Sequence, residues 1–216
     1  RNMPIAELWS SMARQLPIEN REIDGYSHHS YSIFSSGRQI SFSEKHDREF
    51  SEHSRVGSAS PGGPERMKEK RDIVENWLPR YTGTPLNEFG AYVLLTNFDN
   101  YVEWFASQQG AVIKGIDRPM PNVTSDGITL INFGMGSPNA ATVMDLLSAI
   151  APKAVLFLGK CGGLKRKNHI GDLILPIAAI RGEGTSNDYL PPEVPALPAF
   201  QLQRAVSTMI RDLGFD

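Results

Sequence analysis

One short stretch constrains the fold of this chain more than any other. Ala154 to Leu158 is wholly apolar and runs directly into the glycine turn Gly159-Lys160-Cys161-Gly162-Gly163. A strand that is apolar on both faces is typical of a parallel sheet covered by helices on each side. Glycine has no Cβ, so a glycine turn at the end of such a strand lets the backbone approach a ligand closely. We therefore predict a small-molecule pocket at the carboxyl edge of a parallel sheet.

Strand and helix patterns alternate from Met67 onward. Strands are predicted at Tyr92–Thr96, Gly127–Phe133, Ala154–Leu158 and Leu173–Ile180. Helices are predicted at Ile73–Leu78, where Pro79 ends the helix, and at Asn100–Gln109, Asn139–Ile150 and Phe200–Leu213. This alternation predicts an α/β fold of three layers, with a mixed, mostly parallel sheet flanked by helices.

Residues 1–66 differ in composition from the rest of the chain. Thirteen of them are serine, and the segment ends in the proline- and glycine-rich run Ser58–Pro64. This composition predicts a mostly disordered leader with a flexible linker. We therefore divide the chain into a leader, residues 1–66, and a globular domain, residues 67–216, for which Met67 is a natural start. The leader is either a native segment or an artificial or read-through extension, and the sequence leaves both open.

Metal and cofactor sites are not expected. Four of the five histidines lie in the leader, as His28, His29, His46 and His53. The pair His28–His29 offers two metal ligands, but no further His or Cys follows at ligand spacing. Solvated histidines are the alternative that we favour, and we predict neither a metal nor an organic cofactor.

Composition excludes several classes of protein. The net charge of −2 argues against nucleic acid as the main partner. No apolar run reaches the roughly 18 residues that a membrane span needs. The single cysteine, Cys161, excludes an intrachain disulfide and fits a reducing compartment. We expect a cytoplasmic protein with no membrane partner.

The first candidate site is the turn Gly134-Met135-Gly136-Ser137, between a predicted strand and a predicted helix. Backbone N–H groups at a helix start point toward such a turn, and the helix dipole favours an anion there. The spacing matches neither a Walker loop nor a complete G-x-G-x-x-G. Anion or sugar binding and a simple tight turn both fit it.

The second candidate is the turn with Lys160, Cys161 and Gly162. Lys160 either meets a phosphate or stays solvated. We expect Cys161 to be a small buried residue rather than a nucleophile, because His169 is the only histidine of the globular part that could activate it.

The third candidate is Arg181, which begins a loop that also contains Glu183. An arginine can hold a phosphate or carboxylate through two parallel hydrogen bonds. The alternative is a surface ion pair between Arg181 and Glu183 that contributes little. Asp172 is expected to accept hydrogen bonds from turn amides rather than act as an acid or base.

Together these stretches resemble the nucleoside phosphorylase/nucleosidase superfamily over about residues 71–216. Gly134–Gly136 looks like its first glycine turn, Gly159–Gly163 like its central pocket turn, and Arg181–Ala196 like a later loop. The combination of Leu94–Phe98, Asn132–Ala140 and Gly159–Gly163 is most similar to the nucleosidases that cleave AMP. The resemblance implies hydrolysis of the N-glycosidic bond of AMP to adenine and ribose 5-phosphate, and a homo-oligomer. It implies substrate contacts from Gly134, Met135, Gly136, Ser137, Lys160, Cys161, Gly162 and Arg181.

Two departures from the superfamily favour water over phosphate as the nucleophile. Its phosphorylases carry a Gly-Asp-Pro-x-Arg stretch after the first strand, where this chain has Asn97–Tyr101. They also carry an arginine two residues before the central turn, where this chain has Phe157. Loss of two guanidinium groups should remove most affinity for free phosphate.

A third departure concerns the catalytic acid. The superfamily's Met-Glu motif for ribose and its purine-protonating aspartate come later in the chain, and neither has a counterpart before Asp216. We therefore expect an amino-terminal part of the enzyme, with an unpaired sheet edge and little activity alone. A nucleoside phosphorylase and a non-catalytic nucleotide-binding module remain open as alternatives.

Overall fold

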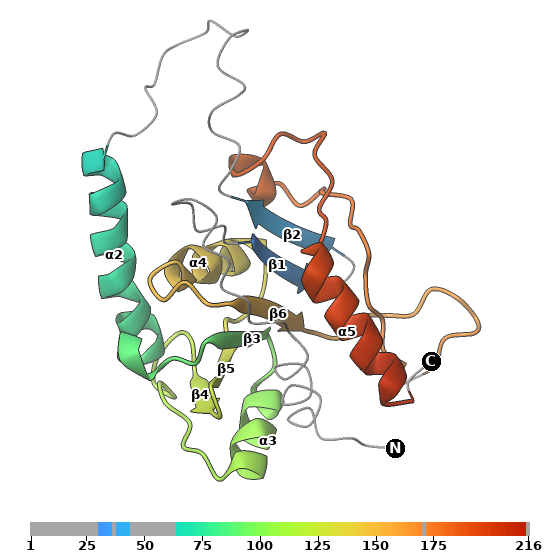
Figure 1. The fold of residues 1–216 in the computed structure, drawn as a ribbon, viewed down its shortest axis with the longest axis horizontal. Helices are drawn as coiled ribbons and strands as arrows, with labels where there is room; N and C mark the ends of the chain where they lie inside the picture. Colours follow the sequence, from blue (N-terminus) through green and yellow to red (C-terminus); the bar gives the residue numbers. More distant parts are fainter. Residues whose placement is uncertain (1–29, 36–37, 44–63, 170–171, 215–216) are drawn as a thin grey trace, which may run out of the picture.

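The computed structural model describes residues 30–35, 38–43, 64–169 and 172–214. Six strands and four α-helices lie in these ranges (Figure 1). The strands are β1 (Ser30–Ser35), β2 (Arg38–Ser43), β3 (Tyr92–Thr96), β4 (Asn122–Ser125), β5 (Ile128–Asn132) and β6 (Ala154–Leu158). The α-helices are α2 (Pro64–Thr82), α3 (Asp99–Gln109), α4 (Ser137–Leu147) and α5 (Phe200–Asp212). None of these helices is long and apolar enough to cross a lipid bilayer.

The main sheet has the strand order β4-β5-β3-β6. β3 pairs in parallel with β5 on one side and with β6 on the other, while β4 pairs antiparallel with β5. All five residues of β3 are buried, as expected for a strand with a hydrogen-bonded neighbour on each side and a helix layer on each face. The predicted mixed, mostly parallel sheet is confirmed.

Helices α2 and α4 cover one face of the sheet. Side chains that alternate along the strands, such as Val93 and Leu95 of β3, point to this face and are fully buried. They pack against Leu78 of α2 and Leu147 of α4. The buried side of α4 thus packs against the side chains that alternate toward this face of the strands.

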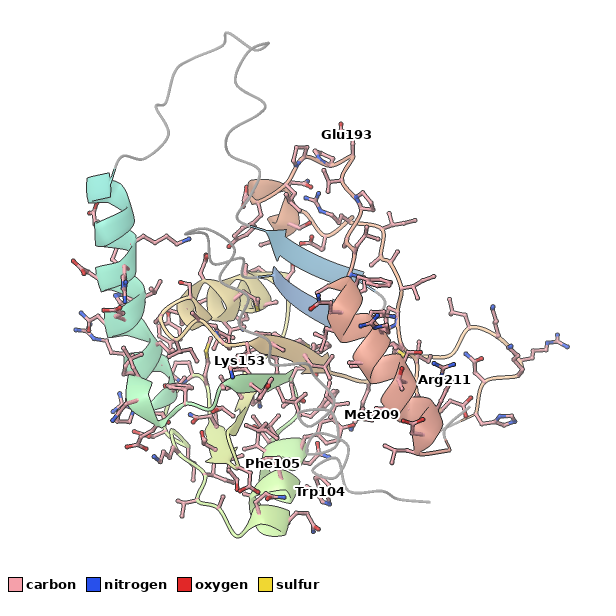
Figure 2. The ribbon with its side chains drawn as sticks, in the orientation of Figure 1. Trp104, Phe105, Lys153, Glu193, Met209 and Arg211 are labelled. Carbon is pink, nitrogen blue, oxygen red and sulfur yellow. The ribbon has the colours of Figure 1, made fainter. Side chains whose placement is uncertain are left out.

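Helices α3 and α5 cover the opposite face. Leu94 of β3 packs there with Phe105 of α3 and Met209 of α5, which are 2% and 0% exposed. Figure 2 labels Phe105 and Met209 on these two helices. The two helix pairs and the sheet between them form the three layers that the alternating pattern predicted.

Helix α2 continues past Pro79, contrary to the prediction that proline ends it. A proline inside a helix removes one N–H donor and crowds the preceding turn. Here the helix runs on to Thr82, whose hydroxyl donates to the carbonyl of Leu78 at 2.7 Å. Gly83, with φ of +68°, then ends it. The buried Leu78 and Thr82 anchor the last turn on both sides of Pro79, so packing outweighs the local cost.

The predicted strand Leu173–Ile180 is wrong. Apart from a bridge between Ala179 and Ala196, this segment pairs with none of the described strands. Its apolar side chains are largely exposed, Ile177 at 78% and Ile180 at 90%. Strand propensity describes residues that suit a pleated, half-buried surface. Without a neighbouring strand, those residues form no ladder.

Strand β4 was missed, although the chain carries a strong signal for it. Asp126 and Gly127, with φ of 49° and 75°, join β4 to β5 in a two-residue turn. An Asp-Gly pair with positive φ at both residues is a preferred hairpin connection.

A second hairpin lies within the segment that we expected to be mostly disordered. β1 and β2 pair antiparallel from Ser30–Ser43 to Ser35–Arg38, and they form a sheet of their own. β1 lies beside β6 (Figure 1) without joining the main sheet. Within the described ranges, the outer edge of β6 is therefore unpaired. The four leader histidines and the predicted helical pattern Met3–Leu16 lie outside the described residues.

A buried polar cluster ties β4 to the end of α2, and its loss should destabilise the fold. Asn122 is 0% exposed, donates to the carbonyl of Thr82 at 2.7 Å and accepts from the hydroxyl of Thr84 at 2.8 Å. Asn122→Ala leaves these groups buried without partners, which should lower the free energy of unfolding by about 2–4 kcal/mol. Urea denaturation measures it. The exposed Asn100→Ala serves as control, with an expected change within about 0.5 kcal/mol. Equal effects of the two variants would contradict this role.

Candidate functional site

The carboxyl ends of the three parallel strands lie in one row. Thr96 of β3 is the register partner of Asn132 of β5 and of Leu158 of β6. The turns that follow these strands therefore emerge at the same edge of the sheet. Ligands of open α/β sheets bind outside this edge. The structure thus places the first and second candidate turns at the same edge of the sheet.

The β5–α4 turn depends on two glycines with positive φ. Gly134 and Gly136 have φ of +79° and +96°, which side-chain-bearing residues rarely adopt. A Cβ on Gly134 would also lie only 3.0 Å from Nδ2 of Asn139. Gly136 is the N-cap of α4, while Met135 is 74% exposed. The turn therefore has a fixed path with an open surface.

A polar chain that the sequence analysis did not single out supports this turn. Asn132 is 8% exposed and donates from Nδ2 to Oδ1 of Asp99 at 2.6 Å. Its Oδ1 accepts from the N–H of Gly134 at 2.9 Å. The side chain therefore links the turn after β5 to the start of α3. An asparagine as the last residue of a mostly apolar strand was the available signal.

Lys160 reaches from the turn after β6 to the segment after β3. Its Nζ lies 4.2 Å from the ring centroid of Phe98 and 5.3 Å from that of Tyr101. An ammonium group at this distance from an aromatic face is attracted by the ring quadrupole. Phe98 and Tyr101, which were not predicted as site residues, thus belong to the same edge.

The rest of this turn is open. Cys161 is exposed, so our expectation that it is buried was wrong, and its thiol is free. A Cβ on Gly162 would meet no atom of the described residues within 4 Å. In the following loop, Oδ2 of Asp172 accepts from the N–H of His169 at 2.8 Å. The prediction that Asp172 satisfies a turn amide is confirmed.

Arg181 holds its own loop together. Its guanidinium donates to the carbonyls of Pro191 and Val194 from one terminal nitrogen, at 2.5 and 3.0 Å. The other terminal nitrogen donates to the carbonyls of Ser186 and Leu190, at 2.5 and 2.6 Å. Nε donates to the hydroxyl of Ser186 at 3.0 Å. A guanidinium has five N–H donors, and all five are used here. This geometry leaves none for a phosphate and includes no ion pair with Glu183 within the described residues.

The loop that Arg181 organises docks on α4. The hydroxyls of Ser137 and Thr185 lie 3.1 Å apart, and the Tyr189 hydroxyl donates to Oδ2 of Asp145 at 2.9 Å. Burial and the neighbouring Asp145 carboxylate raise the pKa of Tyr189 to about 12, so this hydroxyl stays a donor at neutral pH. The first candidate turn is thus in contact with the third candidate segment through Ser137 and Thr185.

Glu183 lies at this junction. Burial alone would raise the pKa of its carboxyl. Hydrogen bonds from Ser186, Ser137 and Thr185 outweigh burial, so the pKa is lowered from its ordinary value. The charged form is therefore the one that the folded loop prefers.

The surface hollow of this loop differs from the predicted pocket. A hollow of about 320 Å³ is lined by Ala178–Arg181 and Pro192–Pro195. Of the predicted site residues, Arg181 alone lines it.

Among the described residues, no group of three or more His, Cys, Asp or Glu side chains could hold a metal ion.

Replacement of Arg181 should loosen its loop without unfolding the domain. Arg181→Lys replaces five fixed donors by a single ammonium group, so the loop carbonyls lose partners. We expect the amides of Leu190, Val194 and Ala196 to exchange with solvent at least about tenfold faster. Hydrogen exchange measures this, and the exposed Arg166→Lys is the matched control. Unchanged exchange in Arg181→Lys would show that the guanidinium does not hold the loop.

The hydrogen bonds that the Glu183 carboxylate accepts should be lost only when the pH is lowered. Its pKa is lower in the folded loop, so its stabilising contribution is complete above the unfolded pKa of about 4.3. It is lost as pH falls through the lower folded pKa. The Ser186 amide signal in NMR should therefore shift in an acid step below about pH 4.3. Glu183→Gln should lack this step, and a step that persists in that variant would assign it to another group.

The chain is similar to known proteins of one family. A family model described as the phosphorylase superfamily matches residues 83–216. AMP nucleosidase of Escherichia coli K12 is 32% identical over 166 residues, which cover 60% of this chain and 34% of that protein. Guanosine phosphorylase of Halorubrum lacusprofundi is 35% identical over 81 residues, which cover 37% of this chain and 34% of that protein. The chain thus spans about a third of the length of these curated relatives.

Two solved structures show the same architecture. AMP nucleosidase from Bacteroides thetaiotaomicron superposes with a TM-score of 0.67 and 63% identity, over 68% of this chain and 64% of that one. Purine nucleoside phosphorylase from Toxoplasma gondii gives a TM-score of 0.53 and 21% identity, over 62% of this chain and 56% of that one, which shows the fold alone. The matched region contains β3 to α5 and all three candidate segments. This chain belongs to the phosphorylase superfamily.

Proposed function

We propose that the protein containing this chain hydrolyses the N-glycosidic bond of AMP, giving adenine and ribose 5-phosphate. The observation that carries this proposal is that aromatic side chains, Tyr101 and Phe157, stand at the two positions where the superfamily's phosphorylases carry a phosphate-binding arginine. After β3, where phosphorylases would present an arginine, the chain presents the rings of Phe98 and Tyr101. Phe157 is 8% exposed and packs edge-on to Phe133, 5.7 Å away between centroids, in the core beneath α4.

Water is the nucleophile that fits this surface. A phosphate dianion needs fixed cationic donors, which Arg181 does not supply because its own loop engages it. In hydrolysis, the water oxygen bonds to the anomeric carbon and the electrons of the C–N bond pass to the purine, which takes up a proton. Positive charge develops on the sugar ring as that bond breaks. We assign the catalytic acid to none of the described residues.

The substrate contacts that we propose lie in the turns at the sheet edge. Gly134, Met135, Gly136 and Ser137 provide a turn with open backbone at the start of α4, where the helix dipole favours the substrate's phosphate. Lys160, Cys161 and Gly162 provide an exposed turn at the same edge of the sheet. For Arg181 we propose an indirect contribution, through the loop that it holds against Ser137.

We also propose that the enzyme is a cytoplasmic homo-oligomer acting on small molecules alone. The superfamily resemblance supports the oligomer, and the lone cysteine supports a reducing compartment. Sedimentation velocity on the purified protein tests the oligomer, and a monomer at micromolar concentration would contradict it.

Adenine release tests the proposed reaction. The full natural polypeptide that contains this sequence should release adenine from AMP at the same rate with and without inorganic phosphate. The sugar product should be ribose 5-phosphate. Adenosine with phosphate is the comparison substrate. Cleavage of adenosine that requires phosphate and yields ribose 1-phosphate would identify a phosphorylase instead. AMP binding without turnover would favour a binding module.

A further inference from the structure

Lys160 occupies an unusual position for an exposed lysine. It follows β6, yet its ammonium group lies over side chains that follow β3. The side chain therefore spans the carboxyl ends of two neighbouring strands. This crossing places a positive charge at the edge where the substrate is expected.

The aromatic surface under Lys160 is held in place by contacts that do not involve Lys160. Phe98 and Tyr101 meet edge to face, with centroids 5.7 Å apart and ring planes at 78°. The N–H of Tyr101 donates to the carbonyl of Phe98 at 3.2 Å, and the N–H of Phe98 donates to Oγ1 of Thr96 at 3.3 Å. Both rings are half-buried. Burial raises the pKa of Tyr101, which keeps the phenol neutral under the ammonium.

No described carboxylate neutralises Lys160. Lys70 and Lys114, by contrast, pair with Asp145 and Glu88. Asp99 lies on the same turn as Phe98, but its Oδ1 accepts a hydrogen bond from Asn132. An ammonium group held by rings keeps its full charge, because aromatic faces accept no proton and contribute no negative charge. The N–H donors that do not face the rings remain available to an anion.

We propose that Phe98 and Tyr101 form a cradle that aims the Lys160 ammonium at the phosphate group of a nucleotide, so that these three residues select nucleotides over nucleosides. This inference rests on the proposed function and refines it. AMP carries a dianionic phosphate where adenosine carries a neutral hydroxyl, so one charge-assisted contact separates the two substrates.

The test compares AMP with adenosine in the full natural polypeptide. Lys160→Met keeps the apolar stem and removes the charge of an exposed side chain, so folding should be unaffected. We expect the ratio of kcat/KM for AMP to that for adenosine to fall by about tenfold to a hundredfold, mainly through KM for AMP. Lys160→Arg should restore most of the ratio, since guanidinium also stacks on rings. Lys167→Met, an exposed lysine of the following loop, is the matched control and should leave the ratio unchanged.

The cradle is tested separately from the charge. Phe98→Leu keeps an apolar side chain but removes the ring, and should lower the same ratio by about twofold to fivefold. The double variant with Lys160→Met should be no worse than Lys160→Met alone, because the ring acts through the ammonium. A further loss in the double variant would overturn the cradle.

Other outcomes would overturn the charge assignment. If Lys160→Met lowers kcat/KM for AMP and for adenosine equally, Lys160 has a structural role. If it instead alters the dependence of adenosine cleavage on inorganic phosphate, the ammonium binds free phosphate. If the unmodified protein cleaves no AMP, the proposed reaction fails, and calorimetric binding of AMP against adenosine still decides the role of Lys160. Equal affinity for both ligands would then reject it.

Discussion

The parallel pairing of β3 with both β5 and β6 is the interaction on which the remaining structure depends. It satisfies the backbone of a wholly buried strand on both sides and lets its side chains alternate between two helix layers. The common register also aligns Thr96, Asn132 and Leu158. Any slip of one strand would separate the turns and turn its apolar side chains to the wrong face. The same strand register therefore determines both the packing of the core and the position of the turns at the candidate site.

A second organising centre lies outside the sheet. Arg181 converts the segment from Ser186 to Val194 from an irregular stretch into a fixed loop, because its planar guanidinium meets carbonyls at several positions at once. Ser137 and Asp145 then receive this loop on α4. The Arg181 guanidinium thus fixes the conformation of the loop rather than binding an anion. A loop whose only regular element among the described residues is the short 3-10 helix Thr185–Asp188 thus gains a defined place against α4.

The charge distribution at that edge fits a substrate that brings its own phosphate. The guanidinium of Arg181 is engaged, the Asn132 amide is shared between Asp99 and Gly134, and Lys160 rests on aromatic rings. The exposed Lys160 ammonium is the group that we propose for the phosphate of a nucleotide. Hydrolysis by water is the reaction that we propose, and the similarity to AMP nucleosidases supports it.

The sequence by itself determined the elements whose burial is periodic and local: β3, β5, β6, α3, α4 and α5, the three-layer fold, and the turns that end the strands. It also carried the Asp126–Gly127 signal for β4, which was overlooked. Tertiary structure alone decided that α2 passes Pro79, that Leu173–Ile180 stays unpaired, and that Arg181 faces its own loop. It alone set Lys160 on Phe98 and Thr185 against Ser137. Hydrophobic periodicity records which face of an element is buried. The contacts of Lys160 and Thr185 instead join separate elements, and the path of α2 and of the Arg181 loop depends on how side chains are buried and bonded once the layers have packed.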